Sequence, residues 1–188
     1  MKLPLLALSL ASLALAQTTP VSVIIETELG NVGAQIDTVH APISAANFLR
    51  YVEAGLYDGA RFHRTVKPDN QPNNDVKIEV IQAGLAPGVK GFPPIPLERT
   101  SVTGLSHKDG TLSMARNGPD TATSDFSICI GDQPALDFAG KRNPDGQGFA
   151  AFGRVTKGME VVRKIQAQPS DARQRLTPPI KILRIARE

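Results

Sequence analysis

Glycine and proline account for 16 and 15 of the 188 residues, and they are spread along the whole chain. Proline lacks a backbone N–H, and glycine loses the most conformational freedom when it is ordered, so both interrupt helices. Long uninterrupted helices are therefore excluded, and short elements joined by turns are expected. Hydrophobic residues make up 41% and charged residues 21%, which fits one globular domain rather than a disordered, collagen-like or multi-span membrane chain.

Charge gives little indication of a partner. The formal net charge is +3, and no run of five or six like charges is present. Such a run would be typical of an arm that binds nucleic acid, so no nucleic-acid partner is expected.

The first residues have the pattern of an export signal. Lys2 is followed by an apolar stretch from Leu3 to Leu15, and Ala14-Leu15-Ala16 has the small-x-small form of a cleavage site. The stretch is shorter than the roughly 20 apolar residues that a membrane anchor needs. We therefore expect a signal peptide at 1–16 and a mature domain at 17–188, with no membrane attachment after cleavage. The mature protein would be periplasmic or secreted.

Export would place the chain where disulfides form, yet Cys129 is its single cysteine and cannot make an internal one. It lies in the apolar run Phe126–Ile130, which favours a buried and unreactive thiol. The fold must then be held together by its core.

Hydrophobic spacing predicts an opening hairpin, two helices and a closing strand. The run 21–28 is rich in β-branched residues and 32–36 is a second run that contains apolar residues, with a turn expected at Gly30-Asn31. Apolar residues then recur at helical spacing from Pro42 to Leu56, and again from Met159 to Ile165. The last strand is expected at 180–186.

Between the two predicted helices lie short runs separated by turn residues, which favour a β-barrel or a sandwich. They are 61–66, 76–82, 111–115, 126–130 and 149–155. The polar stretch from Lys67 to Lys77 is expected to be a solvated connection, because its acidic and amide residues match no standard calcium loop. His40, His63 and His107 are scattered without ligand spacing, so no metal and no histidine site are expected.

Three segments carry more specific information: 55–64 (GLYDGARFHR), 110–121 (GTLSMARNGPDT) and 148–155 (GFAAFGRV). In this order they resemble the signature stretches of cyclophilin-type peptidyl-prolyl cis-trans isomerases. With the export signal, the chain is similar to an exported, bacterial-style member of that family. The resemblance runs from about residue 21 to 187. It implies a mainly β fold, a closed eight-stranded antiparallel barrel capped by two helices, with a substrate groove on its outer surface. It also implies a monomer without cofactor or metal, whose partners are proline-containing polypeptides.

The implied reaction breaks no bond. Rotation about an X–Pro peptide bond meets a barrier near 20 kcal/mol because the nitrogen lone pair is delocalised into the carbonyl. A catalyst has only to hold the proline ring and favour the twisted state in which the lone pair is localised. A fixed cation with directed N–H donors suits this task.

The resemblance assigns roles to individual residues. Arg64 matches the catalytic arginine of the family, and Gln82 matches the glutamine that orients it. Arg116 stands where the family usually has an asparagine, and Phe149 where it often has a histidine. The groove is expected to include Ala115, Arg116, Asn117, Asp125 and Phe149.

The proline pocket departs from the family pattern. Two phenylalanines, a methionine and a leucine are usual there, and the matching residues are Glu79, Ser127, Val80 and Leu136. Two functions follow from these observations. The first is an isomerase that assists the folding of exported proteins. The second is a binding module or chaperone of the same fold with little turnover, motivated by Glu79 and Ser127.

Overall fold

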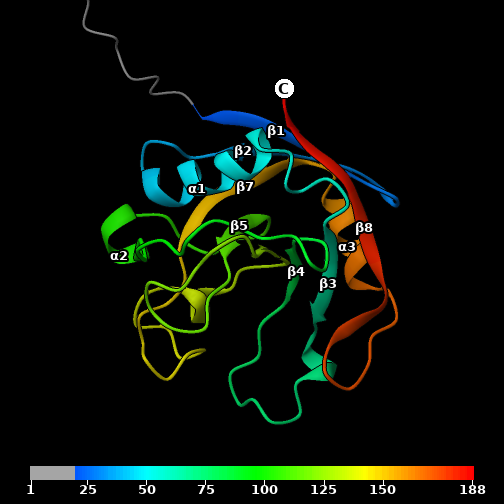
Figure 1. The fold of residues 1–188 in the computed structure, drawn as a ribbon. Coiled ribbons are helices and arrows are strands. Elements are labelled where there is room, and N and C mark those ends of the chain that lie inside the picture. The colour runs from blue at the N-terminus through cyan, green and yellow to red at the C-terminus, as the bar shows by residue number, and fades with distance from the viewer. Residues whose placement is uncertain (1–19) are drawn as a thin grey trace, which may run out of the picture.

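The computed structural model describes residues 20–188, whose eight strands form one closed antiparallel barrel (Figure 1). The predicted signal peptide at 1–16 lies outside the described residues. Within 20–188, no helix is long and apolar enough to cross a membrane. The strands are β1 (Val21–Thr27), β2 (Gly30–Ile36), β3 (Arg61–Val66), β4 (Val80–Gly84), β5 (Thr111–Met114), β6 (Phe126–Cys129), β7 (Ala151–Lys157) and β8 (Arg175–Arg187).

The barrel closes because its first and last strands pair. The strand order is β1-β2-β7-β5-β6-β4-β3-β8, and β8 then pairs with β1. Side chains alternate between the interior and the outer surface, so Val23 and Ile25 of β1 are completely buried while their neighbours are partly exposed. The expected eight-stranded barrel is confirmed.

The two expected helices pack against different sets of strands. They are α1 (Pro42–Glu53), which contacts β7 and β8, and α3 (Met159–Gln166), which contacts β2, β3 and β4. Phe48 of α1 enters the core, where its ring meets Phe126 edge-on with centroids 5.3 Å apart. A third helix of one turn, α2 (Thr100–Thr103), and two 3-10 turns, η1 (Pro68–Asn70) and η2 (Pro134–Leu136), complete the elements.

The opening hairpin turns earlier than predicted. Thr27 pairs with Gly30, so the turn consists of residues 28 and 29, and the expected turn at Gly30-Asn31 is wrong. Gly30 has φ +133°, and a Cβ there would overlap the side chain of Val161. The glycine is needed for this close approach of α3 and for its backbone conformation.

A β-bulge in β3 determines which side chains reach the outer surface. The register of β3 against both β4 and β8 shifts between Phe62 and Arg64, which leaves His63 as an extra residue. In a regular strand, residues 62 and 64 would face the same side. The bulge allows Phe62 to be completely buried in the core while Arg64 faces outward.

The polar connection at 67–77 is mostly exposed, as expected, but it contains one buried residue. Its Gln71 is 1% exposed, and the side-chain amide donates to the carbonyls of Lys67 and Ile78, both at 2.8 Å. The backbone N–H of Ile78 donates back to the Gln71 carbonyl oxygen. One buried glutamine therefore fixes the approach to β4.

Candidate functional site

A row of polar side chains crosses four adjacent strands on the outer surface. The register pairs Arg64 of β3 with Gln82 of β4, and Gln82 with Ser127 of β6. Ser127 in turn pairs with Ser113 of β5. Because paired residues lie directly opposite each other on one face, these four side chains form a continuous strip.

An apolar patch lies beside this strip, two residues further along the strands. Val66 pairs with Val80, and Val80 pairs with Cys129. All three are buried in a small cluster of their own, separate from the barrel core and completed by Ile78 and Leu136. Burial raises the pKa of the Cys129 thiol far above its ordinary value, which agrees with the expected unreactive cysteine.

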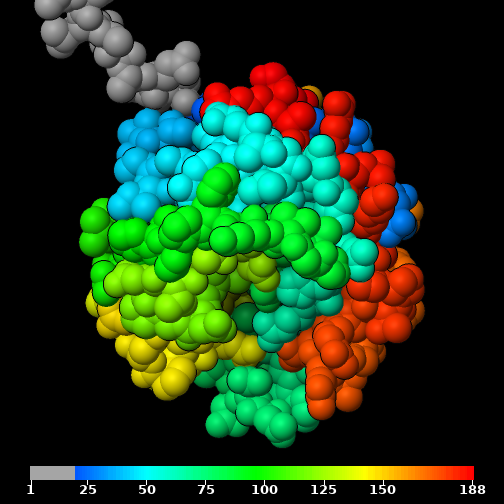
Figure 2. All heavy atoms as spheres, in the orientation of Figure 1, coloured from blue at the N-terminus to red at the C-terminus, as the bar shows by residue number. Residues whose placement is uncertain are grey.

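The strip lines a cavity of about 340 Å³, close to the lower limit for small-molecule sites, together with Ile78, Val80 and Leu136 of the patch. Figure 2 shows the hollow between the teal segments of β3 and β4 and the yellow-green loop after β5. Among the predicted groove residues, those that line the cavity are Val80, Ala115, Arg116, Asn117, Asp125, Ser127, Leu136 and Phe149, together with Arg64 and Gln82.

Arg64 is held between two amide oxygens. Its Nη1 donates to Oε1 of Gln82 at 3.1 Å, and its Nε and Nη2 donate to Oε1 of Gln174 at 3.0 and 2.6 Å. No carboxylate within residues 20–188 forms an ion pair with it. Burial, with a smaller contribution from the positive charge of Arg142, lowers the pKa of Arg64, but a guanidinium remains charged at neutral pH. The site thus presents an oriented and uncompensated cation.

Asp125 determines which way the amide of Gln82 points. Its Oδ2 accepts a hydrogen bond from Nε2 of Gln82 at 3.1 Å and lies 3.1 Å from Nε2 of His63. An ionised carboxylate can only accept, so it selects the NH₂ side of the amide. The carbonyl oxygen of Gln82 is then left facing Arg64.

Gln174 is a residue of this site that the sequence analysis did not identify. It precedes β8, is 9% exposed, and has φ +66°, an unusual conformation for a residue with a side chain. Its Nε2 donates to the carbonyl of Asn70 at 2.9 Å, and its own carbonyl accepts from the backbone of Thr65. No sequence motif marks it, because it reaches Arg64 from a turn 110 residues further along the chain.

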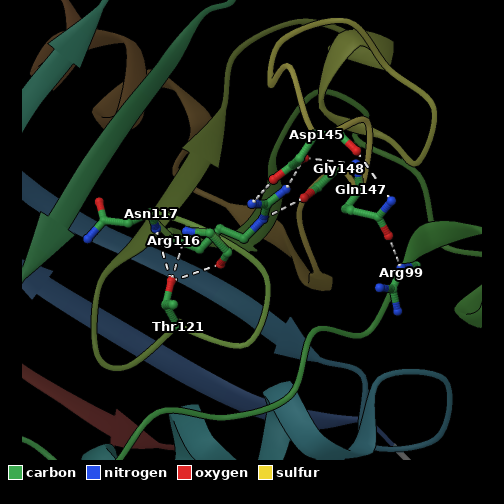
Figure 3. Close-up of polar contacts among 8 residues, drawn as sticks. Arg99, Arg116, Asn117, Thr121, Asp145, Gln147 and Gly148 are labelled. Atoms are coloured by element: carbon green, nitrogen blue, oxygen red, sulfur yellow. Dashed lines mark hydrogen bonds and ion pairs between the residues drawn. The ribbon is translucent and has the colours of Figure 1, made fainter.

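The side chain of Arg116 is committed to the loop before β7 (Figure 3). Its Nη1 and Nη2 donate to the two oxygens of Asp145 at 2.7 and 2.9 Å, and its Nε donates to the carbonyl of Gly148 at 2.7 Å. The paired Arg116 guanidinium, helped by a hydrogen bond from the backbone N–H of Gln147, lowers the pKa of Asp145 to about 2. The guanidinium also lies 5.0 Å from the ring centre of Phe149. Arg116 therefore positions the groove wall.

His107, expected to be an isolated histidine, lies beneath the strip. Its Nδ1 is 2.6 Å from Oδ1 of Asp137, and its Nε2 is 2.8 Å from Oγ of Ser113. Serine, histidine and aspartate occur in this order in hydrolase triads. Here, however, the serine is 2% exposed and the histidine 1%. The contacts tie the β5 strand to the segment that carries Leu136.

Glu79 does not line the cavity, contrary to the expectation from the resemblance. Alternate residues of an extended segment face the same side, so Ile78, Val80 and Gln82 face the groove. Glu79 faces away, and its Oε2 accepts a hydrogen bond from Gln166 of α3 at 2.9 Å. The pocket therefore has an isoleucine wall where a carboxylate was predicted.

A closed antiparallel barrel whose surface groove contains an oriented arginine beside an apolar patch defines a cyclophilin-like protein. Comparison with known proteins agrees with this class. The model of the family described as cyclophilin type peptidyl-prolyl cis-trans isomerase/CLD matches residues 22–187. The chain belongs to this family, and it is a peptidyl-prolyl cis-trans isomerase.

Named relatives cover most of the chain. Peptidyl-prolyl cis-trans isomerase A of Dickeya dadantii (strain 3937) is 37% identical over 161 residues, which are 85% of this chain and 78% of the relative. Peptidyl-prolyl cis-trans isomerase cyp18 of Streptomyces antibioticus is 34% identical over 144 residues, 76% of this chain and 81% of the relative. The crystal structure of a Cryptosporidium parvum cyclophilin-type isomerase shares the fold, with TM-score 0.73, 24% identity, and coverage of 90% of this chain and 98% of that one.

Proposed function

We propose that Arg64 is the catalytic residue of this isomerase and that the protein acts, as a monomer, on proline-containing segments of other exported proteins. The observation that supports the catalytic role is the pair of amide oxygens, from Gln82 and Gln174, that accept hydrogen bonds from Arg64. We call this pair the clamp. Two neutral amides direct the guanidinium without neutralising its charge. Carboxylate partners would orient it equally well but would cancel the field that the reaction needs.

The proposed mechanism is electrostatic and needs no covalent step. The apolar patch around Val80 and Leu136 holds the proline ring, which fixes one side of the X–Pro bond. As the bond twists, the lone pair of the proline nitrogen becomes localised and accepts a hydrogen bond from Arg64. This bond is available only in the twisted state, so it lowers the barrier rather than strengthening ground-state binding.

The proposed substrate class follows the family. A second structure of the Cryptosporidium parvum isomerase was determined in the presence of the dipeptide Ala-Pro; it has a TM-score of 0.71 and 24% identity, and covers 89% of this chain and 98% of that one. A cavity of about 340 Å³ suits a proline ring and the groups next to it. The natural substrates of this chain would be X–Pro segments that are exposed during folding.

Substitution of Arg64 tests the catalytic role. Arg64→Ala should lose most of kcat/KM for an X–Pro peptide while its circular dichroism spectrum is unchanged. Arg61→Ala is the matched control, because Arg61 is exposed on the same strand and outside the cavity. A folded Arg64→Ala protein that retains the kcat/KM of Arg61→Ala would exclude Arg64 as the catalytic group.

Export is supported by the sequence pattern at 1–16 and has its own test. The intact mass of the protein recovered from periplasm or medium should correspond to a chain that begins at Gln17. Retention of Met1 in that fraction would contradict cleavage after Ala16.

A further inference from the structure

A second arginine without a carboxylate partner lines the same cavity as Arg64. Arg142 lies on the loop between η2 and β7 and is partly buried. Its Nη1 donates to Oε1 of Gln71 at 2.9 Å and to the carbonyl of Val76 at 2.7 Å. Its Nε and Nη2 form no hydrogen bond with the described part of the chain. One nitrogen therefore anchors the loop, and the remaining donors of the guanidinium are available to a ligand.

The charges around the cavity are unbalanced. Of its three arginines, only Arg116 is neutralised, by Asp145. Asp125 is the acidic residue among those that line the cavity, and its Oδ2 is already engaged by Gln82 and His63. Arg142 is also near enough to Arg64 for its charge to contribute to the lowered pKa of that residue. Arg64 and Arg142 thus line one groove, and among the described residues neither forms an ion pair with Asp125 or with another carboxylate.

An anionic group in the groove would relieve this repulsion by pairing with the free nitrogens of Arg142. The planar N–H fork of arginine matches the two oxygens of a carboxylate. We propose that Arg142 forms an anion subsite beside the proline pocket, so that preferred substrates carry aspartate or glutamate next to the proline while Arg64 stays available to the proline nitrogen. This inference rests on the proposed function of the groove.

A purely structural role for Arg142 makes a different prediction. The bonds to Gln71 and Val76 join the loop to the connection at 67–77, and loss of that contact would affect all substrates alike. A subsite instead discriminates between substrates by charge. The informative quantity is therefore the ratio of kcat/KM between an acidic peptide and its neutral isostere.

The test uses peptides blocked at both termini, so that no terminal charge is present. Two pairs are compared, Ala-Glu-Pro-Phe with Ala-Gln-Pro-Phe and Ala-Ala-Pro-Glu with Ala-Ala-Pro-Gln. Rates are measured by NMR exchange spectroscopy and corrected for the uncatalysed rate of each peptide. In at least one pair the wild-type protein should favour glutamate about twofold to fivefold, as expected for a partly exposed ion pair.

Arg142→Gln should bring this ratio close to one. The control is Lys141→Gln, which removes a neighbouring exposed charge outside the cavity and should leave the ratio unchanged. A salt titration of the wild type needs no variant, and rising ionic strength should reduce the preference for glutamate. The proposed subsite would be wrong if the wild-type ratio were near one in both pairs. It would also be wrong if Arg142→Gln left the ratio unchanged, or if the ratio did not depend on salt. Absence of turnover with every peptide would instead contradict the proposed function.

Discussion

Gln174 offers a way to disturb the orientation of Arg64 without touching Arg64 itself. Its amide oxygen accepts from two of the three guanidinium nitrogens. Gln174→Gly removes this clamp and suits the backbone, because glycine adopts φ +66° without steric cost. Relief of about 1 kcal/mol of backbone strain offsets part of the hydrogen bonding lost at Asn70 and Arg64. The variant should therefore fold.

The expected effect on catalysis is larger than the effect on stability. A hydrogen bond to a charged group contributes about 1.5–3 kcal/mol, and two such bonds are removed, although water replaces part of each. A loss of about 1.5–3 kcal/mol in transition-state stabilisation corresponds to roughly a tenfold to hundredfold decrease in kcat. The apolar patch that holds proline is unchanged, so KM should change by less than about threefold.

The assay is the rate of X–Pro isomerisation, with urea unfolding to confirm stability. Arg173→Ala is the matched control, because Arg173 lies on the same turn with an exposed side chain. It should retain wild-type kcat. If Gln174→Gly is folded and its kcat is within about twofold of the Arg173→Ala value, the clamp does not set the position of Arg64.

Three further outcomes are expected. A Cβ at Gly84 would overlap the carboxylate of Asp125, so Gly84→Ala should displace that side chain. Because Asp125 orients Gln82 and Gln82 contacts Arg64, kcat should fall with little loss of stability, and an unchanged kcat would contradict this prediction. Ser127→Phe should lower KM for X–Pro peptides by adding an apolar wall, at about 25 cal/mol per Å² buried, and a KM that is unchanged or higher would show that the pocket is built around serine. Arg116 lowers the pKa of Asp145 from 3.8 to about 2, so the stabilisation is complete above about pH 4 and is lost as pH falls through about 2. The difference in the free energy of unfolding between wild type and Asp145→Asn, measured by chemical denaturation, should decrease as the pH falls from about 4 to about 2. A difference that does not change with pH would contradict this role of the Arg116–Asp145 pair.

Elements with a strong local pattern were predictable from the sequence. Apolar spacing marked α1 and α3, and the run 61–66 coincides with β3. The turn of the opening hairpin lies at residues 28 and 29, two residues before the expected Gly30-Asn31. Gly30 has a positive φ at the start of β2, and a Cβ there would overlap Val161 of α3. Sequence alone does not reveal such a tertiary contact.

The candidate site residues were predicted from the family resemblance, and the structure shows which of them reach the groove. Gln82 and Ser127 line the groove, whereas Glu79 lies on the opposite side because neighbouring residues of an extended segment point to opposite sides. Gln174 and Arg142 were not predicted, because turns distant in sequence bring them to the groove. The bulge that directs Arg64 outward likewise depends on pairing with two other strands.

The central claim is that a directed guanidinium, rather than positive charge alone, lowers the barrier to rotation. Arg64→Lys tests it most directly, because lysine keeps the charge but lacks the planar fork that Gln82 and Gln174 orient. The measurement is kcat/KM for one X–Pro peptide in wild type, Arg64→Lys and Arg64→Ala, each shown to be folded. We predict that Arg64→Lys is nearly as inactive as Arg64→Ala. A lysine variant with activity close to wild type would contradict the claim.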